Sequence, residues 1–344
     1  MKEIYWNTQI GPNNFGDEIN TFLWHEIAPY LYEVLPQAYF SGIGTILNDL
    51  IMPQDEQIVI IGSGIGYGPP PKDFYSSNRW KVVFVRGPLT ASILKIEKSC
   101  AISDPALLIK KLADVQNLQA EKINASSQMN CIFIPHHDTM RFSFFWEEVC
   151  NRAGIELVSP LDNPKNIFLK ILSSQLVCTE SLHGAICADA LGVPWIPIVT
   201  QRNVNSFKWW DYCASVQLEY NPMYIEYEST YDKIRNYIMQ KKHSNYALTQ
   251  EDVQKEYSSW YENPKSHLSK KNISRFSKVM KPLLQDVGSI VDKLSLKQEI
   301  RNAVNQFIMI KRSQSFLAKD SIVDCRIEEM MDKLLLFHNQ KGMI

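Results

Sequence analysis

The chain has 344 residues, of which 45% are hydrophobic and 21% are charged, a composition typical of folded globular proteins and not of disordered chains. Its 36 Lys and Arg side chains nearly balance 37 Asp and Glu side chains, so no overall positive field favours nucleic acid as a partner. The length predicts about two domains, each large enough to bury a core.

The ends and the cysteines of the chain indicate its cellular compartment. The N-terminus lacks the apolar stretch of a secretory signal, and no run approaches the ~18 apolar residues that span a bilayer. Seven cysteines are scattered without a Cys-x-x-Cys pair, and several lie in apolar runs, so we interpret them as reduced, buried thiols. These features predict a cytoplasmic protein.

Short apolar runs alternate with helical patterns in the first third of the chain. A strand is predicted at 4–6 and a helix over 17–30, and β-branched runs at 58–61 and 82–85 predict two further strands. Runs that are apolar on both faces are typical of a parallel sheet buried between helices, so the pattern predicts an α/β layered fold. The polar stretch 116–128 is interpreted as a surface connection that contains a domain boundary.

The same alternation resumes after this connection. Strands are predicted at 131–134, 155–158, 175–178 and 195–199, and helices at 144–153 and from 182 to 191, where Gly192 forms a C-cap. Beyond residue 230 the strand signal fades and charged helical patterns replace it. We therefore divide the chain into domains at 1–120 and 121–230 and a helical C-terminal segment at 231–344.

The C-terminal segment contains a strongly basic stretch. Residues 264–319 have twelve Lys and Arg side chains against three Asp and Glu side chains, with apolar residues between them. The interpretation we favour is a solvated helical face packed on the second domain. Peripheral contact with an anionic membrane surface is the alternative that stays open.

Polar residues follow the predicted strands at the sheet edge where ligands bind in parallel α/β folds. Asn14 and Asp17 follow the first strand, where a helix cap explains either residue equally well. Ser63 and Gly64 lie in a glycine-rich turn that can bring backbone N–H groups close to an anion. The third glycine of a dinucleotide fingerprint would fall at Tyr67, so a nicotinamide nucleotide is not the ligand we favour.

A permanently charged side chain, Arg86, comes directly after the run 82–85. A guanidinium at the end of a buried strand needs an anion or a carboxylate as its partner, because an unpaired buried charge costs several kcal/mol. A structural ion pair, with Asp104 as the available acid, and an anionic ligand are both consistent with the sequence.

Histidines stand at two strand ends in the second part of the chain. His136 follows the strand at 131–134, and His183 lies at a strand-to-helix junction beside Glu180 and Ser181, where it can bind phosphate or transfer a proton. A lone histidine is more often a core residue, so the signal is its occurrence at two strand ends. The chain has neither His-Glu-x-x-His nor a Gly-x-Ser-x-Gly elbow, so we predict no catalytic metal and no serine hydrolase.

The segment that follows the last strong strand signal is rich in aromatic residues. Lys208, Trp209, Trp210 and Asp211 combine a cation, two indoles and an acid. Exposed indoles bind sugar rings, whereas buried ones pack in the core, and the sequence supports the two interpretations equally.

Taken in chain order, six segments of this sequence resemble the polysaccharide pyruvyl transferase family. They cover roughly residues 4 to 215 and are Asn-Phe-Gly-Asp at 14–17, Gly-Ser-Gly at 62–64, Val-Arg-Gly-Pro-Leu-Thr at 85–90, Asp-Pro-Ala-Leu-Leu at 104–108, Pro-His-His at 135–137 and Ser-Leu-His-Gly-Ala at 181–185. The resemblance implies two Rossmann-like domains that face a cleft, as in GT-B glycosyltransferases. It also implies transfer of pyruvate from phosphoenolpyruvate to a sugar, usually as a cyclic ketal.

The resemblance suggests roles for individual residues. Arg86 and His183 are expected to bind the donor anion with help from the Gly184 and Ala185 N–H groups, Asp17 and Glu180 to transfer protons, and His136 to bind the acceptor or act as base. Further substrate contacts are expected from Asn14, Gly16, Ser63, Gly64, Ser181 and Lys208. Some family members have an arginine where this chain has Ser181, so Arg202 or Lys208 is expected to supply that charge.

The predicted partners are phosphoenolpyruvate as co-substrate and a lipid-linked oligosaccharide acceptor that contains galactose, with no cofactor. Two other functions stay open. A sugar-nucleotide-dependent glycosyltransferase of the same fold would bind a nucleoside diphosphate in place of phosphoenolpyruvate. A non-catalytic carbohydrate-binding component of polysaccharide assembly would bind sugar without releasing phosphate.

Overall fold

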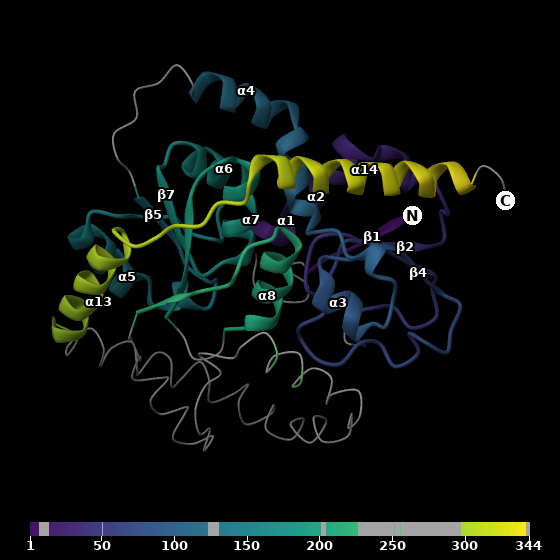
Figure 1. The fold of residues 1–344 in the computed structure, drawn as a ribbon, viewed down its shortest axis with the longest axis horizontal. Coiled ribbons are helices and arrows are strands. Elements are labelled where there is room, and N and C mark those ends of the chain that lie inside the picture. The colour runs from purple at the N-terminus through teal and green to yellow at the C-terminus, as the bar shows by residue number, and fades with distance from the viewer. Residues whose placement is uncertain are drawn as a thin grey trace.

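Two parallel β-sheets form the framework of the protein. The computed structural model describes residues 1–6, 14–49, 51–122, 131–200, 204–225, 251, 255 and 297–341. We call residues 1–122 the first half and residues 131–225 the second half, and each half contains one sheet with helices packed against it (Figure 1).

The first sheet is assembled in chain order. Its four parallel strands are β1 (Lys2–Ile4), β2 (Tyr39–Ser41), β3 (Ile58–Ile61) and β4 (Trp80–Phe84), arranged β1-β2-β3-β4. Every residue of β3 is buried, as expected for a central strand covered on both faces. The connecting elements are α1 (Phe15–Glu18), α2 (Asn20–Ile27), η1 (Pro29–Tyr32), α3 (Pro88–Ile93), η2 (Lys98–Cys100), η3 (Pro105–Lys111) and α4 (Ala113–Lys122).

In the second sheet, the order of the strands differs from their order in the chain. Its strands, β5 (Cys131–Ile134), β6 (Glu156–Leu157), β7 (Leu176–Thr179), β8 (Trp195–Val199) and β9 (Met223–Tyr224), are arranged β6-β5-β7-β8-β9. The chain therefore leaves β5 in one direction and returns to add β7 on its other side, which makes the carboxyl ends of β5 and β7 a topological switch point. The helices are η4 (Thr139–Phe142), α5 (Ser143–Ala153), α6 (Pro164–Leu172), α7 (Leu182–Ala190) and α8 (Ser206–Ser215).

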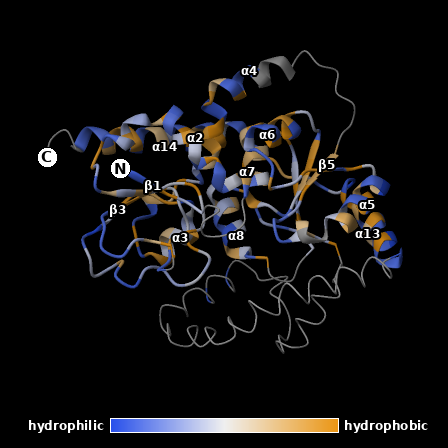
Figure 2. Ribbon diagram, turned by 180° about the vertical axis from the view of Figure 1, so that it is seen from behind, coloured by the Kyte–Doolittle hydropathy of each residue, from blue (hydrophilic) through white to orange (hydrophobic). Residues whose placement is uncertain are grey.

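The two halves share one apolar core. The largest cluster of buried side chains contains Phe40 and Val59 from the first sheet and Ile132 and Val177 from the second. In Figure 2 the strand β5 is orange, the colour of hydrophobic residues. The halves are therefore joined by burial of side chains from both sheets, and the polar residues at their strand ends are brought together by this packing.

Two C-terminal helices return to different parts of the molecule. Helix α13 (Lys297–Ile310) packs on α5, and its Phe307 meets Trp146 of α5 and Phe133 of β5. Helix α14 (Asp320–Lys341) contacts β4, η3 and α7, and so runs from the second half across the first (Figure 1). Its buried residues, Val323, Ile327, Met330, Leu334 and Phe337, recur every three or four positions and form one helical stripe.

The α/β architecture with parallel sheets is confirmed, but several local predictions were wrong. Residues 116–122 of the predicted surface connection belong to helix α4, and the predicted helix over 17–30 is divided into α1, α2 and η1. Strand β2 has only three residues, too few for a recognisable pattern, and was not predicted. The facing of two Rossmann-like domains across a cleft, and the domain limits, stay predictions.

The predicted basic stretch lies mostly outside the described residues. Residues 264–296 of the basic stretch lie outside the described residues, so the membrane contact stays a prediction. Within the described ranges, no helix combines the length and the apolar character that crossing a bilayer requires.

Candidate site between the two halves

Two of the predicted motifs, one from each half, meet at helix α1. The Phe15 N–H donates to the Pro160 carbonyl oxygen of the second half at 2.9 Å, and the Phe15 ring lies edge-on to the His183 ring, with centroids 6.4 Å apart. A Cβ atom added at Gly16 would overlap the His183 ring. Gly16 is therefore required because its missing side chain leaves the space that the imidazole fills.

His183 has an unpartnered nitrogen atom in a buried environment. The residue lies in the first turn of α7, directly after the carboxyl end of β7, and is 9% exposed. Its Nε2 has no hydrogen-bond partner among the described residues. Burial, and then the positive charges of Lys208 and Arg86, lower the pKa of His183 to about 3, so the imidazole is neutral near pH 7. A buried, neutral, unpartnered imidazole is suited to bind a polar ligand or accept a proton.

Asp17 is the buried acid of the same region. Asn14 Nδ2 donates to Asp17 Oδ2 at 2.8 Å. Burial raises the pKa of Asp17 to about 7, although the hydrogen bond from Asn14 and the charge of Lys208 lower it. A substantial fraction of Asp17 therefore holds its proton near neutral pH, which is the state a general acid needs.

Arg86 is buried at the end of β4 and is paired within the protein. It is 1% exposed, and its Nε donates to Asp211 Oδ2 at 3.0 Å. Its Nη1 donates to Thr45 Oγ1 at 2.6 Å, and its Nη2 donates to the Ile65 carbonyl oxygen at 2.8 Å. A guanidinium has five N–H groups, so these three bonds leave donors for a further anion. A Cβ atom at Gly64 would overlap the guanidinium, so Gly64 gives Arg86 its space.

The carboxylate that pairs with Arg86 is Asp211, and not Asp104 as the sequence suggested. Asp211 comes from α8 in the second half and is fully buried. It also accepts hydrogen bonds from the Leu89 and Thr90 N–H groups and from the Thr90 hydroxyl, all in the first turn of α3. One carboxylate thus binds the N-terminus of α3 and orients Arg86. Sequence reasoning missed this role because the pair is separated by 125 positions.

Glu180 joins three strand ends of the second sheet. Its Oε1 accepts from the Thr200 N–H at 2.8 Å and from the Thr200 hydroxyl at 2.5 Å, and its Oε2 accepts from the His136 N–H at 3.1 Å. Burial raises the pKa of this carboxyl group. These contacts favour a positioning role at the switch point of the sheet, with His136 held at the carboxyl end of β5.

The described residues that could hold a metal ion stand next to this point. One ligand atom from each of His136, His137 and Asp138 lies within 4.8 Å of the others. Imidazole and carboxylate ligands suit zinc and related transition metals. The absence of a metal from the reaction stays a prediction.

The backbone groups expected to bind an anion donate within the protein. The Gly64 N–H donates to the Gly44 carbonyl oxygen, and the N–H groups of Gly184 and Ala185 donate to the Ser181 carbonyl oxygen. Among the described residues, the N–H groups of Leu182 and His183 have no acceptor, so they are the donors that the first turn of α7 offers a ligand.

The remaining predicted residues occupy different environments. The Ser63 hydroxyl is buried and lies 2.7 Å from the Ser41 hydroxyl, so it pairs the ends of β2 and β3. Lys208, on α8, is close enough to Asp17 and His183 for its charge to act on both. Arg202 lies outside the described residues. Trp209 is 1% exposed and stacks on Tyr220, so it is a core residue and not a sugar platform.

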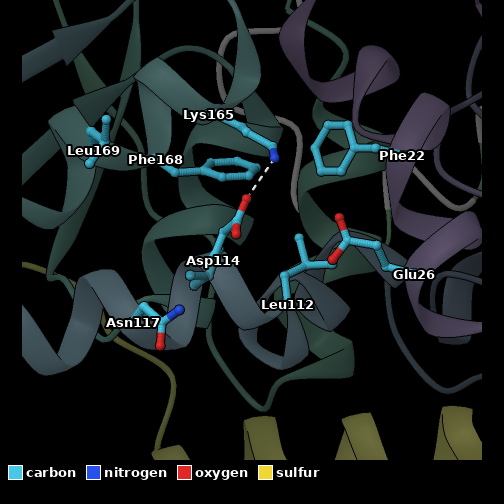
Figure 3. Close-up of a pocket in the computed structure, with 9 residues that line it drawn as sticks. Phe22, Glu26, Leu112, Asp114, Asn117, Lys165, Phe168 and Leu169 are labelled. Carbon is cyan, nitrogen blue, oxygen red and sulfur yellow. Dashed lines mark hydrogen bonds and ion pairs between the residues drawn. The ribbon is translucent and has the colours of Figure 1, made fainter.

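A separate cavity of about 330 Å³ lies between α2, α4 and α6 (Figure 3). Phe22, Phe168 and Leu112 form much of its apolar wall, and the Lys165–Asp114 ion pair crosses it. None of the predicted site residues lines this cavity. The candidate site is therefore defined by the meeting of Asp17, Arg86, His183 and Lys208, and not by the cavity.

The buried ion pair gives a stability prediction. Replacement Asp211→Ala leaves the Arg86 guanidinium unpaired and removes the acceptor of the α3 N–H groups, so we expect a loss of about 3–5 kcal/mol in the free energy of unfolding. Urea denaturation followed by circular dichroism measures it. The matched control is Asp114→Ala, which breaks an exposed ion pair and should cost about 1 kcal/mol or less. Equal losses for the two variants would contradict the structural importance of the Arg86–Asp211 pair.

Comparison with known proteins places these residues in a family. A model of the family described as "Polysaccharide pyruvyl transferase" matches residues 14–202. The chain is 37% identical over 222 residues to "Succinoglycan biosynthesis protein ExoV" of Rhizobium meliloti (strain 1021), covering 64% of this chain and 67% of that protein. It is 23% identical over 232 residues to "Uncharacterized protein L143" of Acanthamoeba polyphaga mimivirus, covering 63% and 76%.

No solved structure matches the chain. The family match contains Asn14, Asp17, Arg86 and His183, whereas Lys208 and Asp211 of α8 follow its last residue. The protein belongs to the polysaccharide pyruvyl transferase family.

Proposed function

We propose that this protein transfers pyruvate from phosphoenolpyruvate to a sugar of a lipid-linked polysaccharide repeat unit, with galactose as the acceptor and a cyclic ketal as the product. The observation that carries this proposal is the meeting of a neutral, unpartnered His183 and a partly protonated Asp17 beside the positive charges of Arg86 and Lys208. Membership of the family and similarity to a succinoglycan biosynthesis protein support it.

The donor is expected to bind through its negative charges. Phosphoenolpyruvate has a phosphate and a carboxylate, and Arg86 and Lys208 are the cations that act on His183. The N–H groups of Leu182 and His183 lie in the first turn of α7, where the positive end of the helix dipole favours binding of a phosphate group. Because Arg86 is already oriented by Asp211 and Thr45, it offers its remaining donors in a fixed geometry.

The transfer itself needs a proton and two hydroxyl groups. In this proposal, Asp17 protonates the methylene carbon of the donor, which becomes the methyl group of pyruvate. One sugar hydroxyl then attacks the central carbon and loses its proton to His183. Attack by a second hydroxyl breaks the bond to the phosphate oxygen, and its proton leaves with the phosphate. The reaction consumes no water and produces one phosphate per ketal.

The carboxyl end of β5 contributes a further polar side chain to the proposed reaction. His136 is held there by Glu180 and is the second candidate base for a sugar hydroxyl. Glu180 accepts bonds from Thr200 and His136, so its proposed contribution is to orient His136 and the start of α7.

The direct experiment incubates the full chain with phosphoenolpyruvate and lipid-linked galactosides and analyses the products by mass spectrometry. We expect one pyruvyl ketal and one phosphate per transfer, and a transfer rate that EDTA leaves unchanged. A melting temperature raised by a nucleoside diphosphate and not by phosphoenolpyruvate would instead indicate a glycosyltransferase. Loss of transfer in EDTA that zinc restores would assign a metal to His136, His137 and Asp138.

The pKa of Asp17 gives opposite predictions for activity and stability. Asp17→Asn removes the acid and should lower transfer by at least ~100-fold. A pKa raised to about 7 means that ionisation of Asp17 destabilises the fold as the pH rises from about 4 to about 7. The variant should therefore be more stable than the native protein at pH 8, by about 1–3 kcal/mol, and similar to it near pH 4.

Transfer by the native protein should also fall as the pH rises through about 7, because Asp17 loses the proton it donates. Urea denaturation at the two pH values and a pH–rate profile measure these effects. A stable Asp17→Asn variant with native turnover would show that another group is the acid.

The close approach of Gly16 to His183 gives a steric prediction. Gly16→Ala places a methyl group where the imidazole lies, so His183 must move and transfer should fall by at least ~10-fold. The control is Glu18→Ala on the same helix α1, which should retain native turnover. Product formation is measured under conditions where circular dichroism shows both variants folded. Native turnover in Gly16→Ala would show that the reaction does not depend on the position of His183.

A further inference from the structure

The loop that follows β3 is fixed by polar contacts from both halves. Arg86 Nη2 donates to the Ile65 carbonyl oxygen at 2.8 Å, and Asn205 Nδ2 donates to the Gly66 carbonyl oxygen at 2.6 Å. Lys208 Nζ donates to the Tyr67 hydroxyl oxygen at 3.3 Å. Asn205 and Lys208 belong to the start of α8 in the second half, so three consecutive residues of this loop are held by side chains distant in sequence.

The loop leaves no room for adjustment at its centre. Gly66 has a φ of +156°, and a Cβ atom added there would lie 2.6 Å from Thr45 Cγ2 and 3.0 Å from Asn205 Nδ2. Only glycine fits this position. Tyr67, which follows directly, therefore has a backbone that is fixed relative to Arg86 and α8.

Tyr67 keeps a large aromatic surface open despite this anchoring. Its side chain is among the more exposed aromatic groups, with 50% of the residue accessible, and Lys208 Nζ lies 5.7 Å from the ring centroid. A tyrosine ring on a fixed backbone offers apolar contact area at a low cost in side-chain entropy. This combination is typical of an aromatic group that packs against a ligand, since a ring needed only for the core would be buried.

The position of Tyr67 connects it to the reacting groups. The Gly64 N–H, three residues before Tyr67, donates to the Gly44 carbonyl oxygen at 2.9 Å, and a Cβ atom added at Gly44 would lie 3.2 Å from Asp17 Oδ1. Lys208, whose Nζ donates to the Tyr67 hydroxyl oxygen, is also close enough for its charge to act on Asp17 and His183. The tryptophans that the sequence offered as sugar platforms are occupied elsewhere, because Trp209 is buried and Trp210 packs edge-on to Tyr220. Tyr67 is the open aromatic ring that adjoins the candidate site in the described part of the chain.

We propose that Tyr67 and Lys208 form the binding subsite for the acceptor sugar. The Tyr67 ring packs against the apolar face of the pyranose, and Lys208 holds the tyrosine hydroxyl and donates to a sugar hydroxyl. The acceptor is thereby placed between Tyr67 and the Asp17–His183 pair. This inference names the acceptor site and rests on the proposed function for the identity of the reaction.

Binding of a simple sugar tests the subsite without turnover. Methyl β-galactoside is titrated into the full chain and followed by saturation-transfer NMR. Tyr67→Ala should weaken its binding by about tenfold or more, and Tyr67→Phe, which keeps the ring, should weaken it less. Affinity for phosphoenolpyruvate, measured by calorimetry, should change by less than about twofold in both variants, because the ring does not contact the donor.

The matched control is Tyr75→Ala. Tyr75 is 52% exposed, and its hydroxyl donates to the Ile93 carbonyl oxygen at the C-terminal end of α3, so this variant removes a comparable open ring from a different loop. Binding of methyl β-galactoside to Tyr75→Ala should equal that of the native protein. Unchanged sugar binding in Tyr67→Ala, or an equal loss in Tyr75→Ala, would overturn the subsite.

The outcome separates this inference from the proposed function. Native protein that transfers pyruvate while Tyr67→Ala keeps its sugar affinity would reject the subsite and retain the function. Tyr67-dependent sugar binding without any transfer from phosphoenolpyruvate would retain the subsite and reject the function. Where transfer occurs, Tyr67→Ala should raise the KM for the acceptor and leave the KM for phosphoenolpyruvate within about twofold.

Discussion

The buried pair between Arg86 and Asp211 is the interaction on which the candidate site depends. An arginine that is 1% exposed at the end of β4 would be unfavourable without a carboxylate, and the carboxylate comes from the other half of the molecule. The same Asp211 accepts the first N–H groups of α3. Formation of the pair therefore fixes α8 against α3, and with it the position of Lys208 relative to Arg86.

Burial has opposite effects on the two groups assigned to proton transfer. It lowers the pKa of His183 because the charged imidazolium loses its hydration, and it raises the pKa of Asp17 because the carboxylate does. The result near neutral pH is a base without its proton, packed on Gly16, and an acid at the next residue, Asp17, that partly keeps its own. Pairs of titratable groups whose surroundings separate their pKa values in this way are typical of active sites. Gly16 makes this possible, since a larger residue would displace the imidazole.

Much of the framework was predictable because it depends on local patterns. The run Ile58–Ile61 is apolar at every position and forms a buried central strand, and the strand at 131–134 was predicted with the bounds that the structure shows. The features that the sequence did not predict are contacts between residues far apart in the chain. Nothing near Arg86 in the sequence indicates that Asp211 is its partner or that Gly64 leaves the space its guanidinium fills.

The same holds for the site residues: their local patterns are visible in the sequence, and their contacts with distant residues are not. A histidine at a strand-to-helix junction is visible in the sequence, but its burial and its unpartnered Nε2 are not, because they follow from the packing of α1 on α7. The sequence distinguishes Tyr67 only because it stands where a dinucleotide-binding fingerprint would have its third glycine. Its role follows from Asn205 and Lys208, which reach its loop from a helix that begins about 140 residues later.

The contacts of Lys208 also bear on a departure from the family pattern. Some members that this chain resembles have an arginine where Ser181 stands, two residues before the histidine, and this chain lacks a charge at that position. Lys208 reaches the same surroundings from α8, since its charge lowers the pKa of both His183 and Asp17. A lysine on a long flexible stem can contact a phosphate as a point charge and the Tyr67 hydroxyl as a donor, whereas an arginine at the N-cap of α7 would offer a planar, bidentate contact. In the proposed reaction, the positive charge of Lys208 would therefore act on the donor phosphate and on the acceptor subsite at Tyr67.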